Sequence, residues 1–251
     1  MNEKLHQLLA QLRLKGIAGV LDQELKRAEK EATPVSEVLY RLLIEEQAHR
    51  QNQSLLYRLK GAKIPWDWTL KTFPFDKQPG VSKAQIQQLS GLAFIERKEN
   101  IVFIGNPGTG KSGLAIGLLR QALLSGYRGR FYHAQNLLDE LYASLADRST
   151  PKLIQRLCRY DLLLIDELGY LTLKPEQINA FFKLMGERYG RNSTILTTNL
   201  SYPEWYDLFQ RKTLVDALLD RLKHHCITIH INGPSLRVSS NGKGKPNPKS
   251  G

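Results

Sequence analysis

Two kinds of hydrophobic spacing divide the chain. Up to about residue 90, apolar residues recur every three or four positions, which is the helical period. One such run is Leu5, Leu8, Leu9 and Leu12, and a second is Val38, Leu39, Leu42 and Leu43. Thr33 and Pro34 precede the second run as an N-cap and a first helical proline. Gly61 and Pro65 are expected to end it, so this part is predicted to be all-helical.

From Leu92 onward, the apolar residues form short continuous runs instead. The runs lie at 101–104, 162–165 and 194–196, and isoleucines alternate at 227, 229 and 231. Helical patterns separate them, for example at 114–124 and 175–188. Continuous apolar strands that alternate with helices are typical of a parallel sheet covered on both faces. The predicted fold class is α/β, with a parallel sheet between helices and a small all-helical domain before it.

These patterns predict four parts. Residues 1–65 are expected to form the helical domain, 66–91 a linker, and 92–237 the α/β domain. The beginning of the linker, 66–80, holds four aromatic residues and two prolines. From Gly233 the chain is rich in Gly, Ser, Asn, Pro and Lys, and 238–251 is predicted to be a disordered basic tail.

A phosphate-binding pattern follows the first predicted strand. Residues 105–112 read Gly105-Asn106-Pro107-Gly108-Thr109-Gly110-Lys111-Ser112 and match GxxxxGK[ST]. The glycines permit positive φ and bring backbone N–H groups close to phosphate oxygens. Lys111 is a cation for the β- and γ-phosphates, and the Ser112 hydroxyl can ligate Mg²⁺. Because a strand precedes the pattern and an amphipathic helix follows it, we interpret it as a nucleotide site and not as a chance glycine-rich turn.

Two further strands end in polar residues. Asp166 and Glu167 follow the run at 162–165, at the end of a strand where ligands bind in such sheets. Asp166 is expected to coordinate Mg²⁺, and Glu167 to act as the general base that polarises the attacking water. The alternative is a strand that ends in two solvated acids. Asn199, after Thr197 and Thr198, is suited to bond the γ-phosphate or the water, although such residues often cap a turn.

The composition adds a possible partner. The chain has 36 Lys+Arg and 24 Asp+Glu, a net charge of +12 and a pI of about 9.7, which favours a polyanion such as nucleic acid. The stretch from Gly233 has four basic and no acidic residues, so the rest of the chain is only mildly basic. Cys158 and Cys226 form no ligand motif, and no signal segment or run of ~18 apolar residues occurs. We therefore expect no membrane association.

In this order the three strand-end motifs resemble those of AAA+ ATPases. More narrowly, the chain resembles the IstB family, transposition helper ATPases of bacterial insertion sequences that are related to the helicase loader DnaC. The residues that carry the resemblance are 12–18, 60–65, 105–112, 160–171, 197–200, 216–222 and 233–237. The likeness covers nearly the whole chain except the tail. The phosphate loop is generic, whereas Asp-Glu-Leu-Gly-Tyr-Leu at 166–171 is specific.

The resemblance implies a function. Such proteins bind and hydrolyse ATP with Mg²⁺, assemble on duplex DNA as homo-oligomers with ATP sites at subunit interfaces, and help a cognate transposase to use its target. It also implies a bacterial cytoplasmic protein associated with the nucleoid. Arg221 matches the arginine that a neighbouring subunit supplies to each ATP site, where its planar group stabilises phosphoryl charge. The alternative for Arg221 is a surface ion pair with Asp220 or Asp216.

The chain departs from the family pattern at two positions. Ser112 stands where threonine is usual and has the same ligand chemistry. Leu236 replaces an aromatic residue in the ending Gly-x-Ser-x-Arg, which weakens the case for a role of Arg237 at the nucleotide. A C-terminal helical lid is not expected, as in DnaC relatives.

Basic residues also cluster in the two helical stretches at 136–160. Lys152, Arg156 and Arg159 follow at spacings of four and three, which predicts one helix face. Related DNA-binding AAA+ proteins carry an extra helix here, which implies DNA-backbone contacts from Arg148, Lys152 and Arg156 that are sensitive to salt. A solvated helix face is the alternative. The N-terminal helices are a second candidate surface, for DNA or for the transposase.

Other features keep more than one interpretation. Trp66, Trp68 and Phe73 are expected to hold the linker on the domain, with stacking on nucleic-acid bases as the alternative.

The function predicted is a DNA-binding AAA+ ATPase that serves a transposase. A replicative helicase loader of the DnaC type is the alternative on the same core. A nucleotide-regulated binding module without hydrolysis is the third class.

Overall fold

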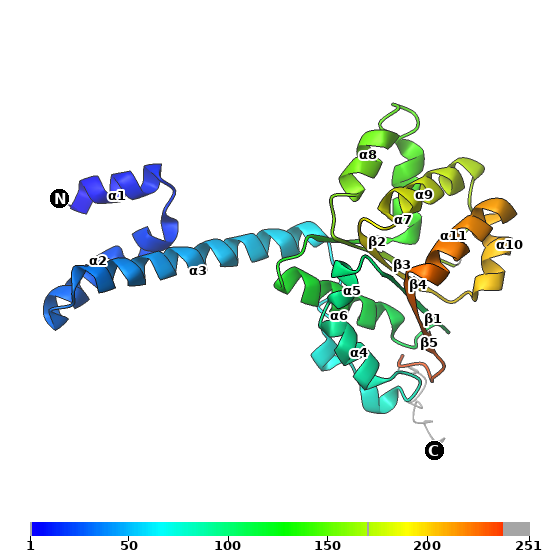
Figure 1. Cartoon of the computed structure of the whole chain (residues 1–251), viewed down its shortest axis with the longest axis horizontal. Helices are drawn as coiled ribbons and strands as arrows, with labels where there is room; N and C mark the ends of the chain where they lie inside the picture. The colour runs from blue at the N-terminus through cyan, green and yellow to red at the C-terminus, as the bar shows by residue number, and fades with distance from the viewer. Residues whose placement is uncertain (1, 170, 238–251) are drawn as a thin grey trace, which may run out of the picture. The chain divides into compact units, whose positions relative to one another are not determined.

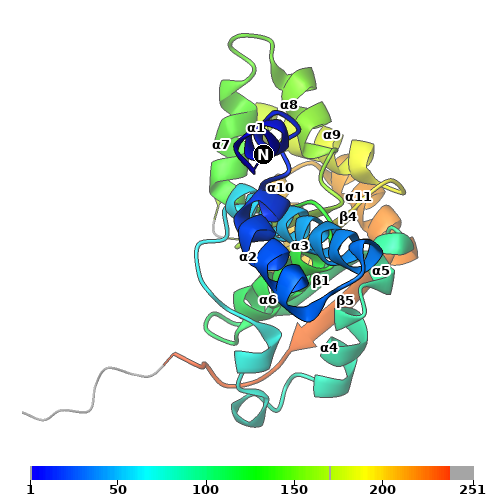
Figure 2. The same ribbon diagram turned by 90° about the vertical axis from the view of Figure 1, so that its left-hand side faces the viewer.

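The computed structural model describes residues 2–169 and 171–237 (Figure 1 and Figure 2). Tyr170 and the predicted tail at 238–251 lie outside the described residues. Contacts within the chain divide it into two units, one up to Lys60 and one from Gly61 onward, and each is described by itself. No helix in the described residues is both long and apolar enough to cross a membrane.

The first unit is built from three helices, as its hydrophobic period predicts. They are α1 (Asn2–Gln11), α2 (Lys15–Glu31) and α3 (Val35–Ala62), of which the last two residues belong to the second unit. Their shared core consists of Leu9, Ile17, Leu21 and Leu42. Helix α3 begins one residue later than predicted, so Pro34 precedes it and its carbonyl accepts the N–H of Val38 at 3.2 Å.

A buried carboxylate joins α2 to α3. Glu46 is 5% exposed and accepts the N–H groups of Gly16 at 2.8 Å and Ile17 at 3.2 Å, in the first turn of α2. Its hydrogen bond with Arg50, together with these N–H groups, lowers the pKa of Glu46. A side chain at Gly16 would collide with this arrangement, because its Cβ would lie 2.7 Å from the Cβ of His49 and 2.8 Å from the Cα of Glu46.

The second unit contains a five-stranded parallel sheet, in the order β2-β3-β4-β1-β5. The strands are β1 (Asn100–Gly105), β2 (Gly129–His133), β3 (Leu162–Asp166), β4 (Ser193–Thr198) and β5 (Cys226–Ile231). The apolar runs predicted four of them, and β2 was missed. The α/β prediction with a parallel sheet between helices is confirmed.

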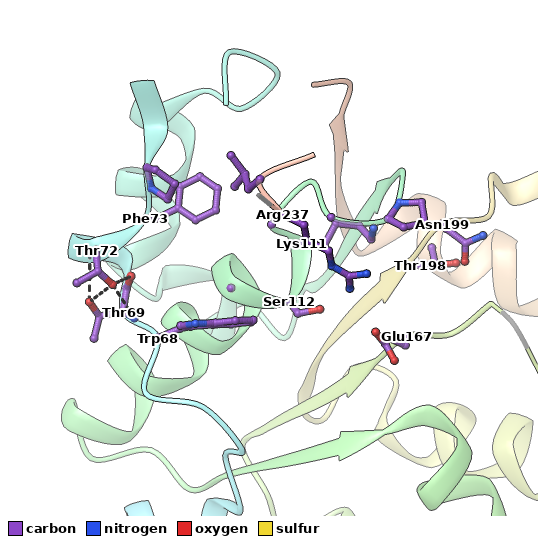
Figure 3. A pocket seen from close by; sticks show the side chains of 16 residues that line it. Trp68, Thr69, Thr72, Phe73, Lys111, Ser112, Glu167, Thr198, Asn199 and Arg237 are labelled. Atoms are coloured by element: carbon purple, nitrogen blue, oxygen red, sulfur yellow. Dashed lines mark hydrogen bonds between the residues drawn. The ribbon is translucent and has the colours of Figure 1, made fainter. Parts of the chain in front are cut away.

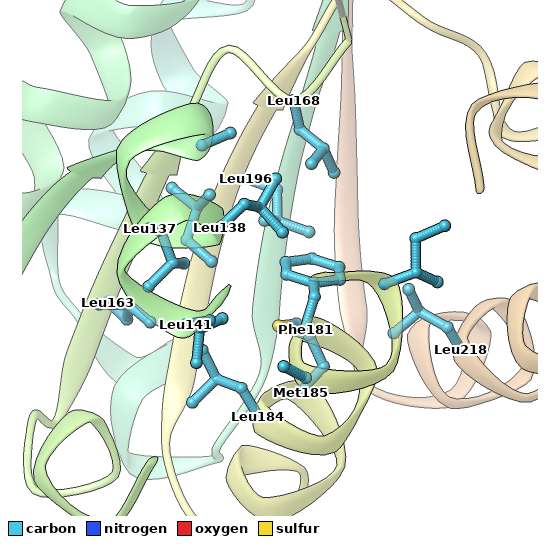
Figure 4. Packing of buried hydrophobic residues seen from close by; sticks show 14 of the residues in the cluster. Leu137, Leu138, Leu141, Leu163, Leu168, Phe181, Leu184, Met185, Leu196 and Leu218 are labelled. Carbon is cyan, nitrogen blue, oxygen red and sulfur yellow. The ribbon is translucent and has the colours of Figure 1, made fainter. Parts of the chain in front are cut away.

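Helices cover both faces of this sheet, which explains its continuous apolar runs. They are α4 (Lys83–Ser90), α5 (Ala93–Glu96), α6 (Lys111–Leu124), α7 (Ala134–Ala143), α8 (Thr150–Leu157), α9 (Pro175–Arg188), α10 (Trp205–Phe209) and α11 (Lys212–His224). Short 3₁₀ turns are η1 (Leu70–Thr72), η2 (Phe75–Lys77) and η3 (Tyr202–Glu204). Alternate strand residues such as Leu163 and Leu196 face one core with α7 to α11 (Figure 4), and α6 packs on the other face.

A buried arginine joins the end of α9 to its surroundings. Arg188 is 1% exposed and donates to the carbonyls of Leu157 at 2.8 Å and Tyr160 at 2.9 Å. It also bonds the Ser193 carbonyl and, at 3.0 Å, the Thr194 hydroxyl. Burial lowers the pKa of Arg188 to about 10. The side chain thus ties the end of α8 to the start of β4.

The strand order decides where the predicted motifs meet. Strands β3, β4 and β1 are neighbours, and their carboxyl ends lie at the same edge because the sheet is parallel. Ile104 pairs with Thr198, and Ile165 pairs with Leu196. The phosphate loop, Asp166 and the end of β4 therefore come together although they are distant in sequence.

Candidate functional site

The phosphate loop forms the turn between β1 and α6. Gly108 and Gly110 have φ of +82° and +91°, which glycine adopts without strain. A Cβ at Gly108 would lie 2.1 Å from the Ser235 hydroxyl, and one at Gly110 would lie 2.6 Å from a ring carbon of Phe73. The loop therefore needs glycine for its backbone conformation and for the close approach of its neighbours.

Other loop residues fix the turn and leave the start of α6 open to a ligand. Thr109 is buried and donates its hydroxyl to the Asn106 carbonyl at 2.8 Å, while Asn106 and Pro107 are exposed. Gly105 ends β1 and Lys111 begins α6. N–H groups at a helix start, together with its positive dipole end, suit an anion such as phosphate.

Lys111 is held inside the loop. Its ammonium donates to the carbonyls of Gly105 at 2.7 Å and Asn106 at 2.9 Å. Burial lowers the pKa of Lys111, whereas the carboxylates of Asp166 and Glu167 act in the opposite direction. The ammonium is therefore a preformed cation at the loop, and a phosphate oxygen can replace the two neutral carbonyls as its partner.

Asp166 and Ser112 offer the ligands of a hard cation. Asp166 is fully buried, and its Oδ1 accepts the Thr197 hydroxyl at 2.5 Å. Its Oδ2 is buried without a hydrogen-bond partner among the described residues. Burial raises the pKa of Asp166, while the hydroxyl groups of Thr197 and Ser112 oppose the rise. An unpartnered carboxylate oxygen beside a serine hydroxyl fits Mg²⁺, which prefers oxygen ligands.

Thr197 links both carboxylate residues to β4. Besides its bond to Asp166, its hydroxyl accepts the N–H of Glu167 at 2.9 Å. Glu167 has φ of +63°, a left-handed conformation that is uncommon for a residue with a side chain. The Glu167 side chain is exposed and lines the cavity described below. The threonine hydroxyl thus supports the backbone turn that presents Glu167.

Asn199 lies at the same edge of the sheet. It follows β4 and lines the cavity together with Thr198. Its carboxamide covers Gly169, where a Cβ would lie 2.1 Å from Oδ1. Thr198 donates its hydroxyl to the Leu168 carbonyl and accepts the N–H of Leu200 at 3.0 Å. These contacts fix the two strand ends against each other.

Several of these groups line a cavity of about 410 Å³. It is lined by Trp68, Thr69, Thr72, Phe73, Pro74, Pro107, Gly108, Gly110, Lys111, Ser112, Gly113, Glu167, Thr198, Asn199, Leu236 and Arg237. Figure 3 shows Trp68 and Phe73 on one side, Glu167 and Asn199 on the other, and Lys111 and Ser112 between them. The cavity therefore has one aromatic end and one charged, hydrogen-bonding end.

The aromatic residues hold a position that the sequence interpretation missed. Trp68 lies against Gly113 in the first turn of α6, with a ring carbon 3.5 Å from where a Cβ would be. Trp66 stacks on Trp68 with ring centroids 4.9 Å apart. The linker packs on the domain, and two of its aromatic rings also line the cavity.

Arg237 was also not assigned by the sequence. The segment after β5 returns to the phosphate loop, where the N–H of Leu236 donates to the Gly108 carbonyl at 2.8 Å. Arg237 lines the cavity close enough to Lys111 to act on its pKa, in the lowering direction. Arg237 thus contributes a second cation, from the C-terminal segment, to the charged end of the cavity.

Arg221 is not brought to this cavity. It is exposed on α11, and its guanidinium lies over the Tyr189 ring at 5.7 Å from the centroid. A residue that completes the site of a neighbouring subunit must be exposed on its own subunit.

The predicted DNA-contact residues lie around α8. Arg148 precedes the helix, and Lys152 and Arg156 are exposed on it. Arg159 follows the end of α8 at Leu157, so the prediction that it shares the helix face is wrong. Arg156 forms an ion pair with Glu140 of α7. The groove between α7 and α8 is therefore of mixed charge and not purely basic.

Comparison with known proteins identifies relatives along most of the chain. Residues 7–244 match the family of IstB-like ATP binding proteins. The chain is 35% identical over 240 residues to a Pseudomonas aeruginosa protein named for insertion sequence IS21 and ATP binding, covering 96% of this chain and 91% of that protein. It is also 35% identical over 238 residues to the Geobacillus stearothermophilus counterpart from IS5376, covering 95% of each.

Solved structures align with about two thirds of the chain. The crystal structure of the DnaC helicase loader aligns with a TM-score of 0.57 and 25% identity, covering 66% of this chain and 98% of that chain. The replication initiator DnaA, solved with AMPPCP and single-stranded DNA, aligns with a TM-score of 0.55 and 20% identity over 67% of this chain and 50% of its own. The predicted AAA+ phosphate-loop core is confirmed.

Proposed function

This chain belongs to the IstB-like ATP-binding proteins of insertion sequences, and from that premise we propose that it is an ATPase that assembles on duplex DNA and assists a partner transposase. The observation that carries the ATPase proposal is that Lys111 and Glu167 line one cavity, while Asp166, with an oxygen unpartnered among the described residues, lies close enough to Lys111 to act on its pKa. These groups differ in role, because Lys111 suits phosphate, Asp166 suits a metal ion and Glu167 is exposed to water.

In the proposed mechanism each side chain acts on a different part of ATP. Asp166 and Ser112 would hold Mg²⁺, which would supply positive charge next to the phosphates when bound. Lys111 transfers its hydrogen bonds from the loop carbonyls to phosphate oxygens. Glu167 accepts a proton from the water that attacks the γ-phosphorus, and Asn199 orients that water or the γ-phosphate. Hydrolysis breaks the bond between the γ-phosphorus and the bridging oxygen and releases ADP and phosphate.

The aromatic end of the cavity suits the base of the nucleotide. Trp68 and Phe73 present apolar ring surface next to the start of α6, and Thr69 and Thr72 contribute hydroxyl groups. Aromatic rings favour stacked or edge contacts with other flat rings. We therefore place the adenine at this end and the phosphates beside Lys111 and Arg237.

The proposed oligomer explains the position of Arg221. Its exposure on α11 leaves it available to the ATP site of an adjacent subunit, where a guanidinium stabilises charge on the transferred phosphoryl group. Hydrolysis would then depend on assembly. The Tyr189 ring under the guanidinium limits its freedom before assembly.

Assembly on duplex DNA is proposed to use backbone contacts from Arg148, Lys152 and Arg156. Because Arg156 is paired with Glu140, a phosphate must replace that carboxylate, which makes the contact weak for each subunit. Repetition around an oligomer would add such contacts and give a strong dependence on salt. The transposase is the partner expected from the insertion-sequence relatives.

Lys111→Ala tests the core of this proposal. With duplex DNA and a non-hydrolysable ATP analogue, the wild-type chain should form oligomers visible by electron microscopy. The variant should form none, because it lacks the cation at the phosphate loop. Lys183→Ala, an exposed lysine on α9 away from the cavity lining, is the matched control. Equal assembly by Lys111→Ala and the control would contradict the proposal.

The DNA surface has a separate test. Replacing Arg148, Lys152 and Arg156 with alanine should weaken DNA binding and reduce its slope against salt concentration. A matched control replaces three other exposed arginines of the second unit, namely Arg97, Arg128 and Arg191. If both triple variants bind DNA alike at several salt concentrations, the surface around α8 is not the DNA contact.

The alternative function is that of a helicase loader, and the structural likeness to DnaC is the observation in its favour. That likeness covers 66% of this chain, whereas the insertion-sequence relatives cover 95–96% of it. We therefore favour the transposition function. Stable co-purification with a hexameric helicase, and none with a transposase, would favour the alternative.

A further inference from the structure

One glutamine outside the predicted motifs connects three segments around the nucleotide cavity. Gln78 lies just after η2 in the linker and is fully buried. Its Nε2 donates to the Thr109 carbonyl in the phosphate loop at 3.0 Å. The same nitrogen donates to the Pro234 carbonyl in the C-terminal segment at 2.9 Å. Both hydrogens of the amide are therefore used, on two segments distant in sequence.

The oxygen of the Gln78 carboxamide is also closely packed. Gln78 Oε1 is buried without a hydrogen-bond partner among the described residues, and it rests against Gly233. A Cβ at Gly233 would lie 1.4 Å from that oxygen. Gly233 does not have positive φ, so contact with Gln78 and not backbone strain accounts for glycine at this position. The unpartnered oxygen is a cost that the two donated bonds offset.

Neighbouring backbone contacts extend this junction. A Cβ at Gly80 would lie 2.7 to 2.9 Å from backbone atoms of Asn232, so the linker and the C-terminal segment run in direct contact. Beyond Pro234, the Leu236 N–H bonds the Gly108 carbonyl at 2.8 Å. The next residue is Arg237, which lines the cavity. Gln78 thus stands at the base of the segment that ends at this cation.

We propose that Gln78 is a positioning residue that clasps the C-terminal segment to the phosphate loop and so directs Arg237 to the phosphates of the bound nucleotide. The proposal rests on the ATP site described above. Gln78 itself is not among the residues that line the cavity. Its effect on nucleotide binding therefore passes through Arg237 and through the shape of the loop.

Gln78→Met provides the direct test, because methionine has similar length and no donor. Titration calorimetry of the full chain with Mg²⁺ and a non-hydrolysable ATP analogue should show about tenfold weaker binding. Gln177→Met is the matched control, since Gln177 is also a buried glutamine with two hydrogen bonds, to Asp139 and Lys174. The control should bind the analogue like the wild type even if its thermal stability falls equally.

The coupling between substitutions at Gln78 and Arg237 distinguishes the proposed positioning role from a merely structural one. Arg237→Ala should weaken binding by a similar factor, and adding Gln78→Met to it should change the dissociation constant by less than about twofold. If the two effects multiply in full, Gln78 does not act through Arg237 and the proposal fails. Gly233→Ala displaces the carboxamide without removing it, so it should reproduce Gln78→Met, and it replaces that variant if the latter does not fold.

A measurement without nucleotide separates this proposal from the ATPase proposal. Hydrogen exchange of the Leu236 amide in the free protein should be at least about tenfold faster in Gln78→Met, and unchanged in Gln177→Met. Unchanged exchange in both variants would overturn the clasp even if ATP binds normally. If the clasp passes this test and the wild-type chain does not bind the analogue, the ATP site fails and the clasp stands as a structural feature alone.

Discussion

Replacing Thr197 with valine should separate the stability of the strand ends from their use in hydrolysis. Valine keeps the shape of threonine but leaves the Asp166 Oδ1 and the Glu167 N–H without their shared partner. The first loss is a buried hydrogen bond to a carboxylate, and the second leaves a partly buried N–H unpaired. Together they should lower the free energy of unfolding by about 2–4 kcal/mol. Urea denaturation followed by circular dichroism measures this difference.

The same variant should hydrolyse ATP at least about tenfold more slowly at saturation, because Glu167 loses the bond that supports its left-handed backbone. Thr197→Ser retains the hydroxyl and should restore most of the rate. Thr194→Val, which removes a buried hydroxyl from the same strand, should destabilise the fold without slowing hydrolysis beyond about twofold. A loss of stability under about 0.5 kcal/mol, or equal rates in all the variants, would refute this reasoning.

Three other predictions use different parts of the structure. Asp166→Asn removes a carboxylate whose pKa is raised by burial. Because a buried carboxylate with a raised pKa destabilises the fold as pH rises, the variant should melt no lower than the wild type at pH 7. Its Mg²⁺-dependent hydrolysis should nevertheless be lost. A clear drop in melting temperature would contradict this. Arg221→Ala should bind ATP normally as a monomer yet lose at least about tenfold of the hydrolysis rate measured in the assembled state. Equal rates would remove the proposed role in a neighbouring site. Arg188→Met removes the buried hydrogen bonds to three carbonyls and should cost at least about 2 kcal/mol of stability in urea. A cost near zero would contradict the anchoring role.

Much of the fold follows from periodicity because its causes are local. Strands at the middle of the sheet are buried on both faces, so their sequences are continuous apolar runs, as at 162–165. Strand β2 has the sequence Gly-Arg-Phe-Tyr-His and stands at the edge of the described sheet. An edge strand tolerates polar residues, and the guanidinium of Arg130 lies over the Tyr132 ring at 5.2 Å. The missing apolar run explains why this strand was not predicted.

In the candidate site, too, the residues that could be predicted are those whose pattern is local in the sequence. The phosphate loop could be predicted because its chemistry lies in eight consecutive residues, 105–112. Trp68, Gln78 and Arg237 join it only through tertiary folding, and Gln78 and Pro234 are 156 positions apart. No local period relates such residues. Arg159 shows that a local pattern can also mislead. Its spacing predicted a place on the same helix face as Lys152 and Arg156, but the helix ends at Leu157.

Phosphate release by the purified full-length chain tests the central claim most directly. It should be measured with ATP and Mg²⁺, with and without duplex DNA, for the wild type and for Glu167→Gln. The wild type should release phosphate, and faster with DNA, while the variant should bind ATP equally well and release phosphate at least about a hundredfold more slowly. Equal release by both proteins, or none by the wild type on DNA, would contradict the claim that this cavity hydrolyses ATP.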